Sequence, residues 1–210
     1  AINIIVVGKQ NMPQWLSLRE ARAQLKNGVG IWKRLDRRWK NPDAVIAASG
    51  DHMTVEAVAA VSLIHALVPQ LALRFVSVSE LTSLGIGDER HPLSLSEKEF
   101  DSYFTEDKPI IFNFHGYPDV IHKLVWNHHH ASRVSVHGYI EEGTTTTPFD
   151  MHVRNQTSRY HIAMDVIEQV AVLNKKFVHS EAKVFDYCEK MLTKHQKYIL
   201  ENGRDMPEVE

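Results

Sequence analysis

Short apolar runs recur along the chain, and most are followed by a turn and a longer segment with helical periodicity. Runs of this length, rich in Val, Ile and Phe and bounded by Gly, Pro or Asn, are typical of strands that are buried on both faces. We therefore predict strands at residues 2–7, 44–48, 73–78 and 110–114, and from residue 134 to a point before Gly143.

The segments between these runs carry helix signals. Ser17 and Glu20 form a capping box, and overlapping boxes begin at Ser94 and Ser96. Pro118 suits the first turn of a helix. The predicted helices run from residue 17 to 27, 55 to 68, about 96 to 104, 118 to 126, from near 148, over 160–171, and over 184–199 to Asn202 and Gly203.

This alternation predicts βαβ units with right-handed crossovers and a largely parallel sheet. The fold class is α/β, a three-layer α/β/α domain of about five strands. The basic stretch at 33–40 is interpreted as a solvated linker, because a short charge run is usually a solvated face. We divide the chain into residues 1–42 (first strand, capped helix and basic linker from a preceding domain) and the α/β domain at 43–210.

Composition excludes several classes of protein. The chain has 210 residues and 43% hydrophobic residues, so it can bury a core. Its 24 Lys and Arg against 26 Asp and Glu argue against a nucleic-acid or membrane-surface binder. The single cysteine, Cys188, excludes an intrachain disulfide, lies on a predicted apolar helix face and is interpreted as a packed thiol. No apolar run reaches membrane-spanning length, and we predict a soluble, cytoplasmic protein.

The chain opens on Ala1 and enters a predicted strand at once. First strands usually follow a frayed terminus. We therefore expect this sequence to be a piece of a longer polypeptide.

Ligands of open parallel sheets bind beyond the carboxyl ends of the strands, which directs attention to residues 8–10, 49–51, 115–118 and 141–148. The turn at 49–51 lacks the further glycines or the Lys-Ser/Thr of nucleotide-binding loops. We interpret it as a tight turn in which Asp51 or Thr54 caps the next helix.

The 13 histidines do not form a recognisable metal motif. The side chains of the adjacent residues 128–130 diverge, no His-Glu-x-x-His is present, and no Gly-x-Ser-x-Gly elbow occurs. We predict no catalytic residue, cofactor ligand or metal ligand from spacing alone.

Four consecutive threonines, residues 144–147, precede the helix expected near Pro148. Their hydroxyl and amide groups could cradle an anion at a helix start. They could instead satisfy backbone groups of a tight strand-to-helix turn, which the residues alone favour. Both interpretations stay open.

Several segments together resemble the carboxyl-terminal domain of phosphoketolases, thiamine-diphosphate enzymes related to transketolase. The most specific is Gly-Thr-Thr-Thr-Thr-Pro-Phe-Asp-Met at 143–151. The resemblance covers nearly the whole chain, and the other segments carry it in combination: residues 8–10 with Trp15 and Leu16, 49–51 with 54–56, 104–109, 114–118, 137–139 and 202–208.

The resemblance implies a transketolase C-terminal-like fold with one antiparallel edge strand, covering residues 43–210. It implies a full-length enzyme that cleaves xylulose 5-phosphate, and in many members fructose 6-phosphate, with inorganic phosphate to acetyl phosphate and an aldose phosphate. In such an enzyme the thiamine diphosphate supplies the electron sink, and a divalent metal, Mg or Ca, accompanies it. The expected partners are the missing amino-terminal domains of the same polypeptide and further copies in a homodimer or larger assembly.

The Gly-Asp-Gly…Asn metal-diphosphate motif of thiamine enzymes is missing, since His52 follows Gly50 and Asp51. The resemblance therefore implies a structural and dimerisation domain that binds no cofactor and is inactive alone. It also implies that Lys9 contacts the sugar phosphate, a role that suits a mobile point charge. The alternative functions are an independent ligand-binding or regulatory module and, ranked lower, a histidine-dependent metallohydrolase.

Overall fold

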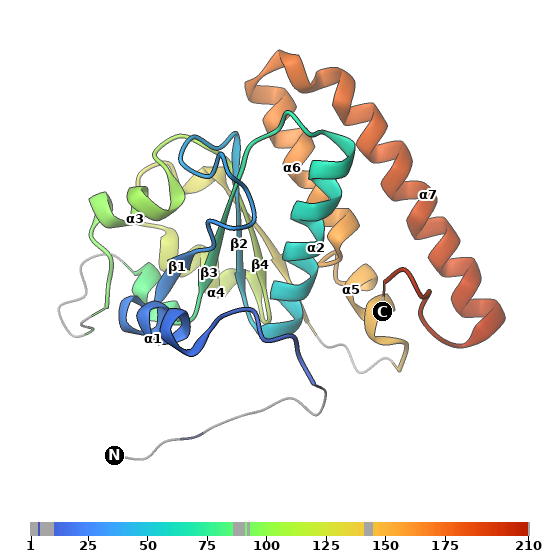
Figure 1. The fold of residues 1–210 in the computed structure, drawn as a ribbon, viewed down its shortest axis with the longest axis horizontal. Coiled ribbons are helices and arrows are strands. Elements are labelled where there is room, and N and C mark those ends of the chain that lie inside the picture. The colour runs from blue at the N-terminus through green and yellow to red at the C-terminus, as the bar shows by residue number, and fades with distance from the viewer. Residues whose placement is uncertain (1–3, 5–10, 86–90, 92, 141–144, 210) are drawn as a thin grey trace.

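The structure is a computed structural model that describes residues 4, 11–85, 91, 93–140 and 145–209. These residues form a five-stranded mixed sheet between two layers of helices, which confirms the predicted fold class (Figure 1). The strand order is β1-β3-β2-β4-β5, with β1 antiparallel to β3 and the other pairs parallel. The strands are β1 (Val29–Ile31), β2 (Ala44–Ser49), β3 (Leu73–Val78), β4 (Ile110–Phe114) and β5 (Val134–Gly138).

Helices cover both faces of the sheet (Figure 1). One layer holds the helices that pack with α2, and the other holds α3 and α4, while α1 lies beside β1. The helices are α1 (Leu18–Asn27), α2 (Asp51–Leu67), α3 (Glu97–Phe104), α4 (Pro118–Val125), α5 (Pro148–Arg154), α6 (Arg159–Leu173) and α7 (Val178–Asn202), with short 3-10 turns at Leu81–Leu84, Ala131–Arg133 and Lys175–Phe177.

The central strand β2 separates two hydrophobic cores. Its Ile46 joins the core shared with α2, α6 and α7, and its neighbours Val45 and Ala47 join the core beneath α3 and α4. Because helices cover both faces, every side chain of β2 from Ala44 to Ala48 is apolar and buried. The short apolar runs in the sequence reflect this two-sided burial.

The edge strand β1 departs from the sequence prediction. Residues 28–42 were expected to contain only a helix end and a linker, yet Val29–Ile31 pairs with β3 in the register Gly30↔Ser77. Three residues are too few to show an alternating pattern, and only the partner strand fixes their role. The predicted strand at 2–7 and Lys9 lie outside the described residues. The boundary between residues 42 and 43 stays a prediction.

The basic stretch at 33–40 is only partly a solvated face. Its Lys and Arg side chains are exposed, but Asp36 is buried and accepts hydrogen bonds from the backbone of Leu73 (2.9 Å) and Arg38 (2.7 Å). Its carboxylate also lies 2.9 Å from His65 Nε2 on α2. One buried carboxylate thus anchors the stretch to the sheet.

Capping explains where the helices begin. Ser17 with Glu20 and Ser96 with Glu99 form complete capping boxes, as the sequence predicts. The start of α2 differs, because it follows Gly50 directly, four residues earlier than predicted and without a side-chain cap. The expected cap by Asp51 or Thr54 is wrong: Asp51 is the first helical residue, and Thr54 donates to the Gly50 carbonyl.

Within the described residues, no helix combines the length and the apolar character needed to cross a membrane.

Candidate functional site

Four rings from separate segments meet beyond the carboxyl ends of β2, β4 and β5. His115 follows β4 directly, Tyr139 follows β5 directly, His52 lies in the first turn of α2, and His152 belongs to α5. Their ring centroids are 5.0 Å apart for His115 and Tyr139, 5.4 Å for Tyr139 and His152, 6.2 Å for His152 and His52, and 6.3 Å for His52 and His115. We call these four residues the ring cluster.

The turns around the ring cluster pack tightly. Gly50 has φ +104°, and a Cβ at this position would lie 2.7 Å from the Cβ of His115. A Cβ at Gly138 would lie 2.4 Å from Cδ of Pro118. Both positions require glycine because another turn occupies the space, and Gly50 also adopts a backbone conformation that other residues resist. This close approach brings His52 and His115 together.

His152 is the most buried histidine of the cluster, with 6% of its surface exposed. Burial lowers its pKa to about 4, so the imidazole is neutral near pH 7. Its Nδ1 lies 3.0 Å from the hydroxyl of Thr157, while its Nε2 has no hydrogen-bond partner among the described residues. The ring can therefore exchange a hydrogen bond with a polar group in the adjoining cavity.

A cavity of about 620 Å³ adjoins the ring cluster. Its size is in the range of small-molecule sites. The residues around it come from the chain start, α2, α5 and the chain end: Asn11, Met12, Pro13, His52, Val55, Glu56, Thr147, Pro148, Phe149, His152, Gly203, Arg204, Asp205 and Val209.

The acidic groups of this cavity are already engaged. Glu56 accepts three hydrogen bonds from Arg159, at 2.7 Å from the backbone and at 2.7 and 3.0 Å from the guanidinium. Asp205 accepts from the hydroxyl of Thr147 at 2.5 Å and from the backbone of Phe149 at 2.9 Å. Glu56 joins α2 to α6, Asp205 joins the segment after α7 to the start of α5, and neither carboxylate is positioned as a general base.

The threonine loop is organised by carboxylates. Besides the contact of Thr147 with Asp205, Thr146 donates to Asp150 at 2.6 Å. Two of the four hydroxyls are thus already donated to acidic side chains, which repel a further anion. The described part of the loop therefore supports the turn interpretation, with carboxylates in place of the expected backbone partners. Thr144 lies outside the described residues.

The remaining histidines make separate contacts. His128 lies between Glu97 (Nδ1, 2.8 Å) and the Leu84 carbonyl (Nε2, 2.8 Å), while His137 lies 2.8 Å from Asp165. Among the residues that the structure describes, no three His, Cys, Asp or Glu side chains converge on a position where they could hold a metal ion. These histidines connect elements of the fold.

Cys188 is fully buried on α7, which confirms the packed-thiol interpretation. Burial raises its pKa to about 12, so the thiolate is absent near neutral pH. Lys9 lies outside the described residues, and the nearest described neighbours in sequence, Asn11–Pro13, border the 620 Å³ cavity.

Of the four ring-cluster residues, only His115 belongs to the segments at strand ends that the sequence marks as candidate ligand sites, here residues 115–118. A signal existed for Tyr139 and His52, since both closely follow predicted strands, where ligand sites of parallel sheets form. No local signal marks His152. Only the placement of α5 brings this residue to the cluster.

The chain is similar to known proteins over nearly its whole length. A family model described as the XFP C-terminal domain matches residues 9–210. The chain is 44% identical to a probable phosphoketolase of Bradyrhizobium diazoefficiens and 43% identical to probable phosphoketolases of Rhizobium meliloti and Chlorobaculum tepidum, over 99% of the chain in each case. It spans 26% of the length of each of these relatives.

Solved transketolases share the fold. A transketolase variant from Pichia stipitis matches 78% of this chain with 21% of its own, at a TM-score of 0.54 and 18% identity. Another Pichia stipitis transketolase structure, in complex with sedoheptulose 7-phosphate, matches 71% of this chain with 19% of its own, at a TM-score of 0.51 and 16% identity. At these identities the likeness concerns the fold alone.

Proposed function

This chain belongs to the family of XFP C-terminal domains, and from that premise we propose that it is the carboxyl-terminal domain of a phosphoketolase. The observation that carries the proposal is the match over nearly the whole chain to proteins that bear this name. The proposed enzyme cleaves xylulose 5-phosphate, and in many members of the family fructose 6-phosphate, with inorganic phosphate to acetyl phosphate and an aldose phosphate. The single cysteine supports a reducing, cytoplasmic location.

Thiamine diphosphate and its divalent metal do not fit the residues described here. A metal bound to a diphosphate needs free oxygen donors, but Glu56 is committed to Arg159 and Asp205 to Thr147 and Phe149. We propose that the other domains of the enzyme hold the cofactor, while this chain supports them and contributes to a homodimer or larger assembly.

Lys9 is the proposed contact of this chain with the substrate phosphate. In the full-length enzyme, Lys9→Ala should raise KM for xylulose 5-phosphate about tenfold, because one charged contact to a phosphate is lost, with less effect on KM for inorganic phosphate. The exposed Lys98→Ala on α3 serves as the control and should leave both constants unchanged. Unchanged KM values for Lys9→Ala would remove this residue from the site.

An activity assay of the isolated chain tests the proposal that the other domains hold the cofactor and that this chain supports them. We expect no acetyl phosphate from xylulose 5-phosphate with this chain alone, and full activity from the full-length enzyme under the same conditions. Acetyl phosphate formation or tight thiamine diphosphate binding by the isolated chain would contradict the proposal. A full-length protein without the activity would favour the alternative of an independent ligand-binding or regulatory module.

A further inference from the structure

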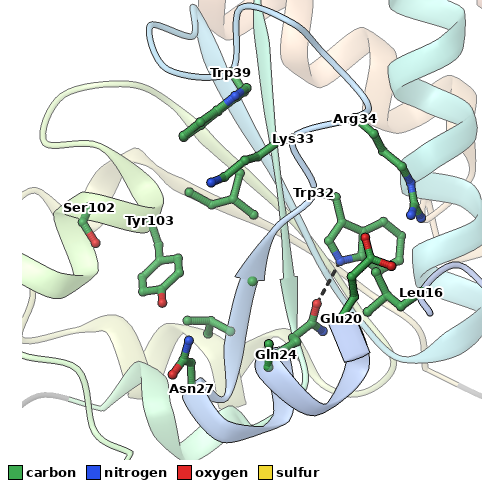
Figure 2. Close-up of a pocket in the computed structure, with 14 residues that line it drawn as sticks. Leu16, Glu20, Gln24, Asn27, Trp32, Lys33, Arg34, Trp39, Ser102 and Tyr103 are labelled. Carbon is green, nitrogen blue, oxygen red and sulfur yellow. Dashed lines mark hydrogen bonds between the residues drawn. The ribbon is translucent and has the colours of Figure 1, made fainter. Parts of the chain in front are cut away.

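A second, larger cavity lies at the β1 edge of the sheet. This groove of about 760 Å³ runs between α1, β1 and the end of α3 (Figure 2). Among the residues that the structure describes, none lines both this groove and the cavity beside the ring cluster. The groove is lined by Leu16, Glu20, Ala23, Gln24, Asn27, Val29, Gly30, Ile31, Trp32, Lys33, Arg34, Trp39, Ser102 and Tyr103.

In one half of the groove, the polar side chains are already hydrogen-bonded within the protein. Gln24 accepts a hydrogen bond from the Trp32 indole at 2.9 Å and donates to the hydroxyls of Ser77 (2.9 Å) and Ser79 (2.7 Å). Glu20 accepts from Ser17 in the capping box of α1. The hydrogen-bonding groups of these two side chains are thus used within the protein, and their role is structural.

The other half carries polar groups without partners. The Asn27 amide, the Lys33 ammonium and the Tyr103 hydroxyl form no hydrogen bond or ion pair with any described residue, and Figure 2 shows them around the same space beside β1. Lys33 Nζ lies 4.8 Å from the ring centroid of Trp39. Burial raises the pKa of Tyr103, so its hydroxyl keeps its proton as a donor.

We propose that this half of the groove binds a sugar phosphate. The half-buried ring of Tyr103 offers an apolar face to the C–H face of a sugar ring, while the Trp39 ring holds the Lys33 ammonium 4.8 Å from its centroid. The Asn27 amide and the Tyr103 hydroxyl match sugar hydroxyls, and Lys33 matches the phosphate. Inorganic phosphate would leave the Tyr103 ring and the Asn27 amide unused, and a neutral sugar would leave Lys33 without a counter-charge.

The test is a titration of this chain with fructose 6-phosphate, followed by two-dimensional ¹⁵N NMR on the Trp39 indole and the Asn27 side-chain amide. We expect saturable shifts of both signals. Fructose and inorganic phosphate should each bind at least about tenfold more weakly, because each offers only part of the matching groups. The titration is repeated in Lys9→Ala, where the shifts should persist, which separates this groove from the contact proposed for Lys9.

Matched variants identify the residues. Lys33→Gln should weaken binding about tenfold or more, because a charge-assisted contact is lost. Lys40→Gln is the control, since Lys40 also lies near Trp39 (5.9 Å) but does not line the groove, and should change affinity less than about twofold. Tyr103→Phe keeps the ring and should weaken binding about threefold to tenfold.

Three results would overturn the proposal. The first is the absence of shifts at Trp39 and Asn27 with 10 mM fructose 6-phosphate, a concentration at which about 1 mM affinity would saturate the site. The second is equal weakening by Lys33→Gln and Lys40→Gln, which would indicate a diffuse charge effect. The third is binding of inorganic phosphate as tight as that of fructose 6-phosphate. This result would show that the groove binds the phosphate group alone and does not recognise the sugar.

Discussion

Burial sets the protonation state of individual histidines in this protein. Burial lowers the pKa of both His152 and His161 to about 4, well below the ordinary value of 6.5 for a histidine. His122 has the same side chain but lies exposed on α4. Histidines of the same chain therefore differ in their environment, because the tertiary structure excludes water from some imidazole rings and leaves others in contact with it.

The lowered pKa values predict acid sensitivity. Below pH 6.5, His152 and His161 bind protons in the unfolded chain but stay neutral in the folded protein. Their contribution to the free energy of unfolding is therefore fully present above pH 6.5 and is lost as the pH falls toward 4. His152 alone should contribute a loss on the order of 2–3 kcal/mol over this range. Urea unfolding at several pH values measures the slope.

Two substitutions separate the contribution of His152 from the rest. Because glutamine does not titrate, His152→Gln should reduce the pH dependence of unfolding between pH 6.5 and 4 and leave the part due to His161. His122→Gln removes an exposed ring and should leave that dependence unchanged. Equal slopes for wild type and His152→Gln would show that this histidine is not buried in its neutral form.

At the scale of elements, the turns after β2, β4 and β5 fit together only with glycine at defined positions. Gly50→Ala forces a Cβ to 2.7 Å from that of His115 and strains φ +104°. We expect a loss of about 2–4 kcal/mol in thermal or urea unfolding. Gly85→Ala is the control, because its nearest atom is 3.6 Å away and its φ is −71°, and it should change stability by less than about 1 kcal/mol. A neutral Gly50→Ala would mean that the turns are looser than described.

A buried ion pair joins α2 to α6. Glu56 and Arg159 lie 2.7 Å apart with 4% and 17% of their side chains exposed. Glu56→Gln leaves the buried guanidinium without its counter-charge and should lower the free energy of unfolding by about 3 kcal/mol. Asp186→Asn breaks the exposed pair with Lys190 and should cost less than about 0.5 kcal/mol. Similar losses in the two variants would contradict this assignment.

The sequence predicted elements well where the signal is local. The capping residues Ser17 and Ser96 and the Gly203 end of α7 are recognised within one turn of chain. The start of α2 was missed because Gly50 caps it through backbone conformation alone. The strand β1 was missed because a three-residue strand exists only through its pairing with β3.

At the scale of the whole molecule, α1 exposes two leucine side chains to solvent. Leu18 and Leu25 are seven residues apart on this helix and are 65% and 63% exposed. We infer that other domains of the proposed enzyme cover them, since solvent-exposed apolar patches mark interaction surfaces. Leu18→Ser with Leu25→Ser should leave unfolding of this chain within about 1 kcal/mol of wild type and lower the melting temperature of the full-length enzyme. An unchanged full-length melting temperature would place the interface elsewhere.

The sequence by itself determined the α/β class, the four parallel strands and the helix boundaries marked by capping boxes. These features depend on apolar periodicity and on contacts a few residues apart, both of which are written locally in the chain. The ring cluster, the neutral state of His152 and the groove beside β1 were decided by tertiary structure alone. Each depends on how residues far apart in the sequence, such as His52 and His152 or Asn27 and Tyr103, are packed in space. Neither proximity in space nor burial can be read from neighbouring residues in the sequence.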